Sequence, residues 1–402
     1  IGTEDEIDII YSVEEETTGS VGGNLGYSDF GLMLGFNLQE QNFLGSGNTV
    51  GIGINKNIYS ESYNISFVDP YATKDGVSLG YNVYFRETDY GEFNVANYLT
   101  NSNGIGAQFG YPTSDITRLG YSLTYDKTDI DIGTLPAREI YDFVSAEGNI
   151  FETISAQATW QRVTLNRGLF PTAGSSTVLS LSATIPGSDL SYYRASVRQR
   201  YYRPLSNNFV FGFQGELGYL DVYGDTKETP FFQNFYAGGP RSLRGFESNT
   251  LGPRSTDAPC YEFNYEEGTC PNLIDIDGDG ELDSPYLNPY ANNTSRYRDR
   301  PIGGNIKIEG SLQLIFRLPF IEDQRSLRSA FFLDFGNVFS DNCKDYQINC
   351  YKPAVEDLRY SYGVGITWIT GFGPLSLAIA KPTNAGPQER TEEFQFTVGN
   401  VF

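Results

Sequence analysis

The stretch NIKIEGSLQLIFR, residues 305–317, alternates between polar and apolar side chains. Alternation with a period of two places successive side chains on opposite faces of a β-strand. The polar face of this stretch carries Asn305, Lys307, Glu309, Ser311, Gln313 and Arg317, and the other face carries Ile306, Ile308, Gly310, Leu312, Leu314 and Phe316. A strand with one wet and one apolar face is therefore expected here.

A second stretch shows what the two faces contact. Residues 193–201 place Arg194, Arg198 and Arg200 on one face, together with Ser196. A charged side chain that faces lipid near the middle of a membrane costs about 2–4 kcal/mol. These arginines are tolerable only in a water-filled lumen, so the pattern favours a membrane-spanning barrel with an apolar outer surface.

Sixteen segments of this kind are expected along the chain. Each is close to the roughly 9–11 residues that a tilted strand needs to cross a bilayer. The predicted strands are 20–27, 31–41, 48–57, 62–69, 77–88, 104–112, 117–128, 152–166, 175–186, 192–203, 208–222, 304–318, 329–339, 360–368, 374–381 and 393–402.

The connections between these segments form two classes. Even-numbered strands are mostly followed by short turns, and several odd-numbered strands by long loops, at 89–103, 128–150, 223–303 and 340–359. Short turns at one end and long loops at the other are typical of outer-membrane barrels. The predicted fold is an all-β, 16-stranded antiparallel transmembrane β-barrel, with both termini on the short-turn, periplasmic side.

The composition agrees with this fold and excludes several functions. The chain has 29 Tyr, 28 Phe and 44 Gly among 402 residues, which favours β-structure. No run of about 18 apolar residues could form a membrane-spanning helix. The net charge of −22 argues against a nucleic-acid partner. Histidine is absent, and no nucleophile–base pair is evident, so we expect no enzyme.

Four cysteines occur as two close pairs, Cys260 with Cys270 and Cys343 with Cys350. Each pair lies in a polar loop, which predicts two local disulfides in an oxidising compartment. A zinc site is the alternative, although the flanking residues are Tyr, Asn and Pro rather than further ligands.

An acidic stretch in the longest loop resembles a calcium-binding loop. It supplies carboxylates at Asp275, Asp277, Asp279 and Asp283, with Gly280 at the turn. The twelfth position is Tyr286 instead of Glu, which excludes a full EF-hand. A structural Ca²⁺ ion in loop 6 is one interpretation and a plain acidic surface loop is the other. No cofactor is required by any other pattern.

Four motifs in order carry a family resemblance. They are YAGGPRSLRGFESNTLGP (236–253), NRGLFPTAGS (166–175), FFLDFGNVF (331–339) and GFGPLSLAIAKP (371–382). With NFLGSG (42–47), TIPGSD (184–189) and EEFQFTVGNVF (392–402), they make nearly the whole chain similar to the BamA family of barrel-assembly proteins. Relatives of that family include the two-partner secretion transporters and TamA.

The resemblance implies a function and a set of partners. It implies an insertase in the outer membrane of a Gram-negative bacterium, which folds and inserts β-barrel proteins. Unfolded outer-membrane protein clients, outer-membrane lipid and accessory assembly lipoproteins bound through periplasmic domains would be the partners. The alternatives are a two-partner-type secretion pore and a TamA-like translocation or assembly barrel.

The same resemblance divides the chain. Residues 1–18 are acidic and alternate weakly, which suggests the end of a preceding periplasmic (POTRA) domain and a linker. Residues 19–402 would form the barrel, with loop 6 at about 223–303. No signal peptide is recognisable, so we expect a mature or trimmed chain.

Two functional sites follow from the family. Loop 6 would fold into the lumen, where Arg244 would pair with Asp334. The family's second acidic partner falls on Gln313, which is a departure, and Glu309, on the same face, is the expected substitute. The residues of this anchor in the loop are Gly238, Gly239, Arg244, Gly245 and Phe246.

The second site is the seam between the first and last strands. Glycine weakens strand pairing, so a poor join could part laterally and offer free strand edges to clients. The alternative is that these glycines accommodate close packing. The seam residues are Gly22, Gly23, Asn24, Leu25, Gly26, Phe394, Phe396, Val398, Gly399, Asn400 and Phe402.

Overall fold

The computed structural model describes most of the chain. The described residues are 17–29, 31–93, 95–96, 98–132, 137–256, 300–319, 321, 325–345, 347, 350–371 and 373–399. The predicted end of a periplasmic domain, residues 1–18, falls almost wholly outside them. The structure does not test this assignment, which remains a prediction.

Sixteen antiparallel strands close into one barrel, as predicted. Each strand pairs with its neighbours along the chain, and the first strand pairs with the last. The wall consists of β1 (Gly19–Ser28), β2 (Gly31–Glu40), β3 (Thr49–Lys56), β4 (Ser60–Asp69), β5 (Ser78–Asp89), β6 (Leu99–Ser114), β7 (Thr117–Asp131), β8 (Ile150–Val163), β9 (Gly174–Thr184), β10 (Tyr192–Pro204), β11 (Phe209–Val222), β13 (Ile306–Phe316), β14 (Leu327–Phe339), β15 (Arg359–Thr370), β16 (Gly373–Pro382) and β18 (Phe394–Val398).

The remaining elements belong to the loops. A separate two-stranded sheet pairs β12 (Gly245–Phe246) with β17 (Thr391–Glu392). The described residues also form one α-helix, α1 (Arg138–Glu147), and short 3₁₀ turns. The turns are Phe43–Gly45, Tyr90–Phe93, Phe231–Gln233 and Val355–Asp357. No helix among the described residues is long and apolar enough to span a membrane.

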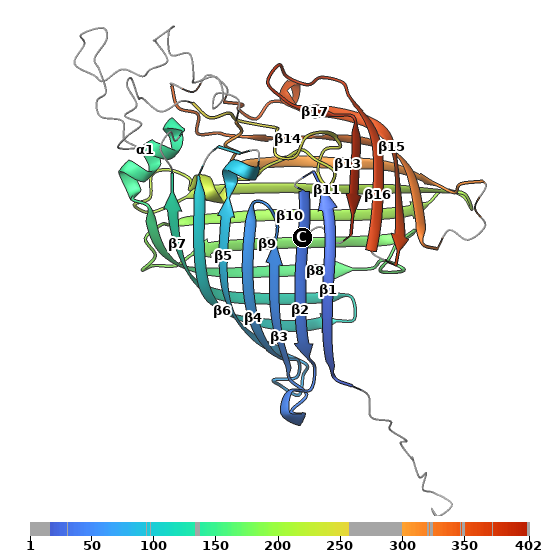
Figure 1. The fold of residues 1–402 in the computed structure, drawn as a ribbon, viewed down its shortest axis with the longest axis horizontal. Coiled ribbons are helices and arrows are strands. Elements are labelled where there is room, and N and C mark those ends of the chain that lie inside the picture. The colour runs from blue at the N-terminus through green and yellow to red at the C-terminus, as the bar shows by residue number, and fades with distance from the viewer. Residues whose placement is uncertain are drawn as a thin grey trace, which may run out of the picture.

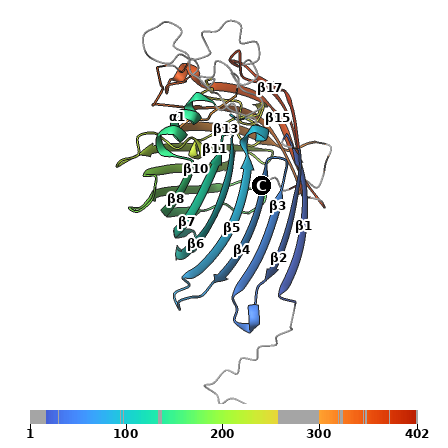
Figure 2. The same cartoon turned by 60° about the vertical axis from the view of Figure 1, so that its left-hand side comes forward.

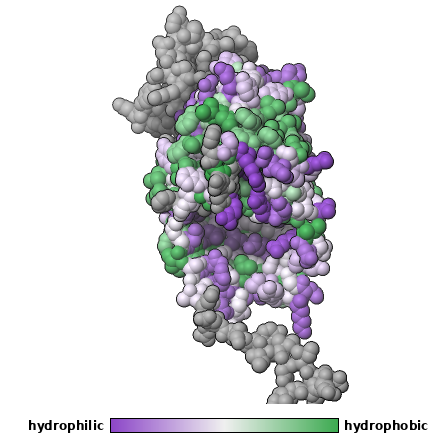
Figure 3. All heavy atoms as spheres, turned by 90° about the vertical axis from the view of Figure 1, so that its right-hand side faces the viewer, coloured by the Kyte–Doolittle hydropathy of each residue, from purple (hydrophilic) through white to green (hydrophobic). Residues whose placement is uncertain are grey.

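The wall has the two faces that the alternation predicts. On β14, which lies between β13 and β15, Phe331 is 54% exposed and Leu333 is 42% exposed. Asp334, on the same strand, is fully buried. The exposed side chains form the apolar outer surface, and the alternate ones point inward. In Figure 3, hydrophobic residues cover much of one face, and a hollow with hydrophilic walls lies between them.

Two features were missed in the sequence, for different reasons. The strand predicted at 104–112 begins earlier, since β6 starts at Leu99 and its first residues pair with the end of β7. These residues, LTNSN, have no apolar face, so the alternation gives no signal there. Helix α1 lies within the predicted loop 128–150 and was missed, because a helix of ten residues gives little periodic signal.

The long loops gather at one end of the barrel, where α1 and β17 lie, and β1 begins at the opposite end (Figures 1 and 2). There the loops share an apolar core. Ile140 and Phe143 of α1 are buried with Tyr98, Phe231 and Ile302, which come from three other parts of the chain. This core ties loop 6 to its neighbours above the lumen.

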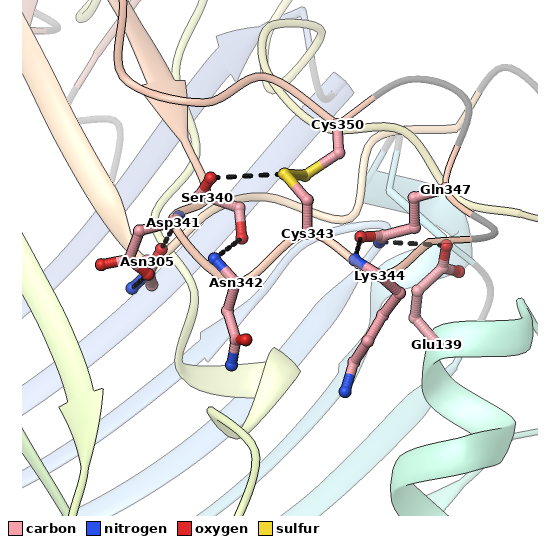
Figure 4. The surroundings of a disulfide bond; sticks show 9 residues. All are labelled: Glu139, Asn305, Ser340, Asp341, Asn342, Cys343, Lys344, Gln347 and Cys350. Carbon is pink, nitrogen blue, oxygen red and sulfur yellow. Dashed lines mark hydrogen bonds between the residues drawn. A yellow bond between two sulfur atoms is a disulfide. The ribbon is translucent and has the colours of Figure 1, made fainter.

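The disulfide between Cys343 and Cys350 forms as predicted (Figure 4). Within the loop that it closes, the Gln347 side chain donates a hydrogen bond to Glu139 of α1, 3.2 Å away. Burial raises the pKa of the Glu139 carboxyl above its usual value. Cys260 and Cys270 lie outside the described residues, so the second disulfide remains a prediction.

Removal of this disulfide should loosen the loop and leave the barrel folded. For a loop of this length, the loss of the cross-link lowers the stability of the folded loop by about 2–3 kcal/mol in the chain-entropy model. We expect the double variant Cys343→Ser and Cys350→Ser to show faster hydrogen exchange across residues 340–358, with unchanged exchange in β5–β8. Equal exchange in the variant and the wild type would contradict the prediction. The reductant-treated wild type is the control, and it should match the variant.

Candidate functional site

The hairpin of loop 6, residues 236–253, owes its shape to glycine. Gly238 and Gly239 both have φ near +100°. The N–H of Gly239 donates to the carbonyl oxygens of Leu243 (3.2 Å) and Phe246 (3.1 Å). A side chain at Gly238 would overlap the carbonyl oxygen of Glu247. The GG dipeptide therefore permits a tight fold that brings the RGF motif back beside it.

Apolar side chains hold this hairpin against the wall. Leu243 and Phe246 are fully buried, in a cluster with Leu220 of β11, Val338 of β14 and Leu251 of the hairpin itself. Burial of one such side chain contributes about 1.5–3 kcal/mol. The hairpin thus lies against the inward-facing side chains of two wall strands.

Arg244 forms a bidentate pair with Asp334 of β14. Its Nε and Nη2 donate to the two carboxylate oxygens, each at 2.7 Å, and its backbone N–H adds a third bond at 3.2 Å. The guanidinium also lies 3.4 Å from the centre of the Phe332 ring. Asp334 is fully buried and the Arg244 side chain is 16% exposed. Such a fork geometry is strong, and either charge alone would be stranded.

The remaining contacts of Arg244 differ from the expectation. Its Nη2 donates to the Ser311 hydroxyl at 3.0 Å, and Ser311 lies directly opposite Asp334 in the β13–β14 pairing. Glu309 accepts instead from Ser242 (2.6 Å) and pairs with a neighbouring lysine. Gln313 donates to Ser311 at 3.3 Å. The expected substitute, Glu309, therefore holds the hairpin through Ser242 rather than through Arg244.

Ser311 was missed in the sequence because a serine on a wet strand face is the ordinary case. Its one signal is its position, two residues along the same face from both Glu309 and Gln313. A cavity of about 550 Å³ lies beside these residues, between the hairpin and the wall. Its charged lining includes Arg198, Glu216 and Lys307. The inner wall here is wet and highly charged.

The seam between β1 and β18 is poorly paired. Tyr27 and Val398 are the one pair in register between the two strands among the described residues. By contrast, β1 pairs with β2 over all ten of its residues, from Gly19 to Ser28. The rings of Tyr27 and Phe396 add a tilted contact at 6.4 Å. Among the residues that the structure describes, closure of the barrel at this point therefore depends on little backbone bonding.

The seam glycines have different surroundings. A side chain at Gly22 or Gly23 would meet no described atom within 4 Å, so close packing does not explain glycine at those positions. At Gly399, φ is +76° and a side chain would overlap the carbonyl oxygen of Leu25. Gly399 therefore permits a close approach of the chain after β18 to β1.

The alternation along each strand determines whether the other predicted seam residues face outward or inward. Leu25, Phe394 and Phe396 are exposed on the outer surface, at 60%, 59% and 38%. Asn24 and Gly26 occupy the alternate, inward-facing positions of β1. Asn400 and Phe402 lie outside the described residues.

The predicted calcium ligands also lie outside the described residues. These are Asp275, Asp277, Asp279 and Asp283, so calcium binding remains a prediction. In the described part of the chain, no group of three or more His, Cys, Asp or Glu side chains could hold a metal ion.

The fold and the site together define a class: a transmembrane barrel with an arginine-anchored internal hairpin and a weak closing seam. The Omp85 superfamily domain matches residues 42–402. The chain belongs to the Omp85 superfamily.

Sequence relatives support the same assignment. The outer membrane protein assembly factor BamA of Neisseria meningitidis is 29% identical over 428 residues, covering 100% of this chain and 49% of that protein. The sorting and assembly machinery component 50 homolog of Mus musculus is 23% identical over 367 residues, covering 90% of this chain and 67% of that protein. The chain spans about half the length of the Neisseria relative.

Solved structures share the fold. BamA from Haemophilus ducreyi lacking POTRA domains 1–3 superposes with a TM-score of 0.78 at 29% identity, covering 97% of this chain and 71% of that one. CdiB from Escherichia coli gives a TM-score of 0.54 at 11% identity, covering 96% and 63%. The second likeness concerns the fold alone.

Replacement of Arg244 should release the hairpin. Arg244→Ala strands the Asp334 carboxylate, which costs about 3–5 kcal/mol, and Arg244→Lys should be intermediate because an ammonium cannot form the fork. Hydrogen exchange of residues 236–253 should rise in the order wild type, Lys, Ala. The matched control is Arg198→Ala. The Arg198 side chain is 55% exposed and Lys307 remains beside its partner Glu216, so the loss of the pair should cost about 1 kcal/mol or less. Equal protection of the hairpin in all four proteins would refute an anchoring role.

Proposed function

We propose that this chain is the barrel of an insertase that folds β-barrel proteins into the outer membrane of a Gram-negative bacterium. The single observation that carries the proposal is the sparse pairing of β1 with β18 among the described residues, one pair against the ten that join β1 to β2. The names of the relatives, an assembly factor and an assembly-machinery component, support the same function.

The physical argument begins with the membrane. Inside lipid, a backbone N–H or C=O without a partner costs several kcal/mol, so a strand edge there must be paired. A well-paired edge is inert, because its groups are already bonded to a neighbour. The edge of β1 can exchange its one described pair for a more complete set of bonds with another strand.

A client strand would provide those bonds. An unfolded strand can add to a free edge by main-chain hydrogen bonding, whatever its exact sequence. Burial of the client's apolar side chains against lipid and completion of its backbone bonds would drive insertion, without a nucleotide. The work is conformational, so we assign no covalent reaction to the chain.

The internal hairpin keeps the rest of the wall intact during this exchange. Arg244 and Asp334 fix it to β14, three strand positions away from β18. If the seam opens, β13–β15 remain braced by a bond that does not involve the seam. In this proposal both ends of the barrel chain face the periplasm, and clients would arrive from that side, with accessory lipoproteins bound through periplasmic domains.

A reversible lock across the seam tests this function. Cysteines at Tyr27 and Val398, the residues of the described seam pair, should form a disulfide on oxidation. In full-length protein with its assembly partners in liposomes, we expect oxidation to reduce client folding at least about tenfold and reduction to restore it. The expectation follows because a covalent lock prevents strand exchange at the edge.

The matched control places cysteines at Phe67 and Tyr81, which are paired between β4 and β5. Oxidation of this pair should leave client folding unchanged. Full activity of the oxidised seam variant would rule out the proposed function. Steady conductance in planar bilayers without client folding would indicate the two-partner-type secretion pore instead.

A further inference from the structure

The motif NRGLFPTAGS, residues 166–175, forms the turn between β8 and β9. Because the wall is antiparallel and β8 is its eighth strand, this turn lies at the end of the barrel where β1 begins. The turn is tight: Phe170 has φ +48°, and the Nε of Arg167 donates to the carbonyl oxygen of Phe170 at 2.7 Å. The motif thus places the Arg167 side chain at the short-turn end, away from both the anchor and the long loops.

Arg328 of β14 attaches this turn to the inner wall. The alternation of β14 puts Arg328 on the same inward face as Asp334. Its guanidinium lies over the rings of Phe170 and Tyr202, 5.0 Å and 5.2 Å from their centres, and donates to the carbonyl oxygen of Pro171. Contact with two ring faces fixes the orientation of the guanidinium. The turn is therefore held inside the mouth of the barrel.

A cavity of about 550 Å³ lies between this turn and the turns that follow β10 and β13. We call it the mouth pocket. Its described lining contains no Asp or Glu, but it contains four arginines, Arg167, Arg317, Arg325 and Arg328. The chain as a whole has a net charge of −22, so this gathering of positive charge runs against its composition. A cleft lined by charge of one sign attracts ligands of the opposite sign.

Two of these arginines have hydrogen-bond donors available to a ligand. Arg317 is exposed just beyond β13, and nothing in the described part of the chain pairs with its side chain. Arg167 is exposed too, and its described bond uses Nε and leaves both Nη groups open. A guanidinium with open donors binds a carboxylate in a fork of two hydrogen bonds. Arg325 follows Glu322 and Asp323, which lie outside the described residues, so we assign the site to the other three arginines.

The position of these charges determines which anion can reach them. Arg328 faces into the barrel, so the wall separates it from the headgroups of the membrane. Arg203 of β10 has the opposite orientation, because it shares the outward face with the exposed Tyr201. A lipid phosphate would therefore meet Arg203, whereas the mouth pocket is reached from within the mouth. There Asn207 and Asn208 add side-chain amides, which both donate and accept, as a peptide backbone requires.

We propose that the mouth pocket binds an acidic segment of a periplasmic partner protein, with Arg167, Arg317 and Arg328 as the carboxylate-binding residues. The proposal takes the periplasmic side of the barrel from the proposed function and adds a docking surface to it. A volume of about 550 Å³ is within the range of ligand pockets, so it admits a short extended segment with its side chains. The two rings hold Arg328 in place, and Arg167 and Arg317 supply the open donors.

Fluorescence anisotropy of a labelled hexaglutamate peptide, with full-length protein in phosphatidylcholine nanodiscs, tests this site. Arg317→Gln should weaken binding about fivefold, the factor expected for one exposed ion pair. Arg317→Lys should lie between Arg317→Gln and wild type, because an ammonium keeps the charge but cannot form the fork. Arg167→Gln combined with Arg317→Gln should bind more weakly than either single variant. Added salt should weaken binding to the wild type, since it screens exposed charges.

The matched control is Arg203→Gln, which removes the same charge from the outward face at the same end of the barrel. It should leave binding unchanged, and hexaglutamine should not bind. The retained compact form on semi-native gels shows that each variant is folded. Equal weakening in Arg203→Gln and Arg317→Gln, or no binding to the wild type, would overturn the proposal. Loss of labelled phosphatidylglycerol binding in Arg317→Gln but not in Arg203→Gln would overturn it too, since the ligand would then be a lipid headgroup.

A client-folding assay separates this proposal from the insertase function. If Arg317→Gln loses the peptide but the oxidised seam variant still folds clients, the docking site stands and the insertase function fails. If client folding responds to the seam lock but peptide binding responds to no variant, the docking site is wrong and the insertase function stands.

Discussion

The bond between Arg244 and Asp334 determines where the largest loop of this barrel can lie. Asp334 is fully buried on the inner wall, so its charge needs a partner within the protein. The partner comes from a hairpin whose own turn depends on Gly238 and Gly239. Once the fork forms, the neighbouring residues 245–248 have little freedom, because they follow directly in sequence. The position of these residues inside the barrel is a consequence of the anchor on β14.

This arrangement separates two requirements that conflict in a membrane barrel. A barrel is stable because every wall strand is paired on both sides, yet an assembly barrel needs one edge that can be exchanged. From β2 through β16, neighbouring wall strands pair over at least seven residues, whereas one pair is described between β1 and β18. In the described chain, the sparse pairing is thus greatest at the junction where the barrel closes.

The sequence predicted the barrel well because alternation acts on every wall strand in the same way. All sixteen strands were found, and the errors lie where one face is not apolar, as at the start of β6. The site was predicted only where a motif marked it. Arg244 and Asp334 stand in recognisable motifs, but Ser311 is a polar residue on a wet face, which any barrel contains. Its contact with Arg244 depends on strand register and on a loop fold without periodicity, and only coordinates provide these.

The seam is asymmetric in its backbone as well as in its loop contacts. Strand β18 is five residues long in the described chain. Beyond it, the N–H of Gly399 donates to the carbonyl of Pro374, and a side chain at Gly399 would overlap the carbonyl oxygen of Leu25. The last strand is thus bonded to β16, to β17 and β12 through the hairpin, and only lightly to β1. Strand β1, in contrast, has its full pairing with β2 alone. β2 in turn pairs with β3 over seven residues, from Leu34 to Glu40. The position of β1 therefore depends on the first strands of the wall far more than on the last one.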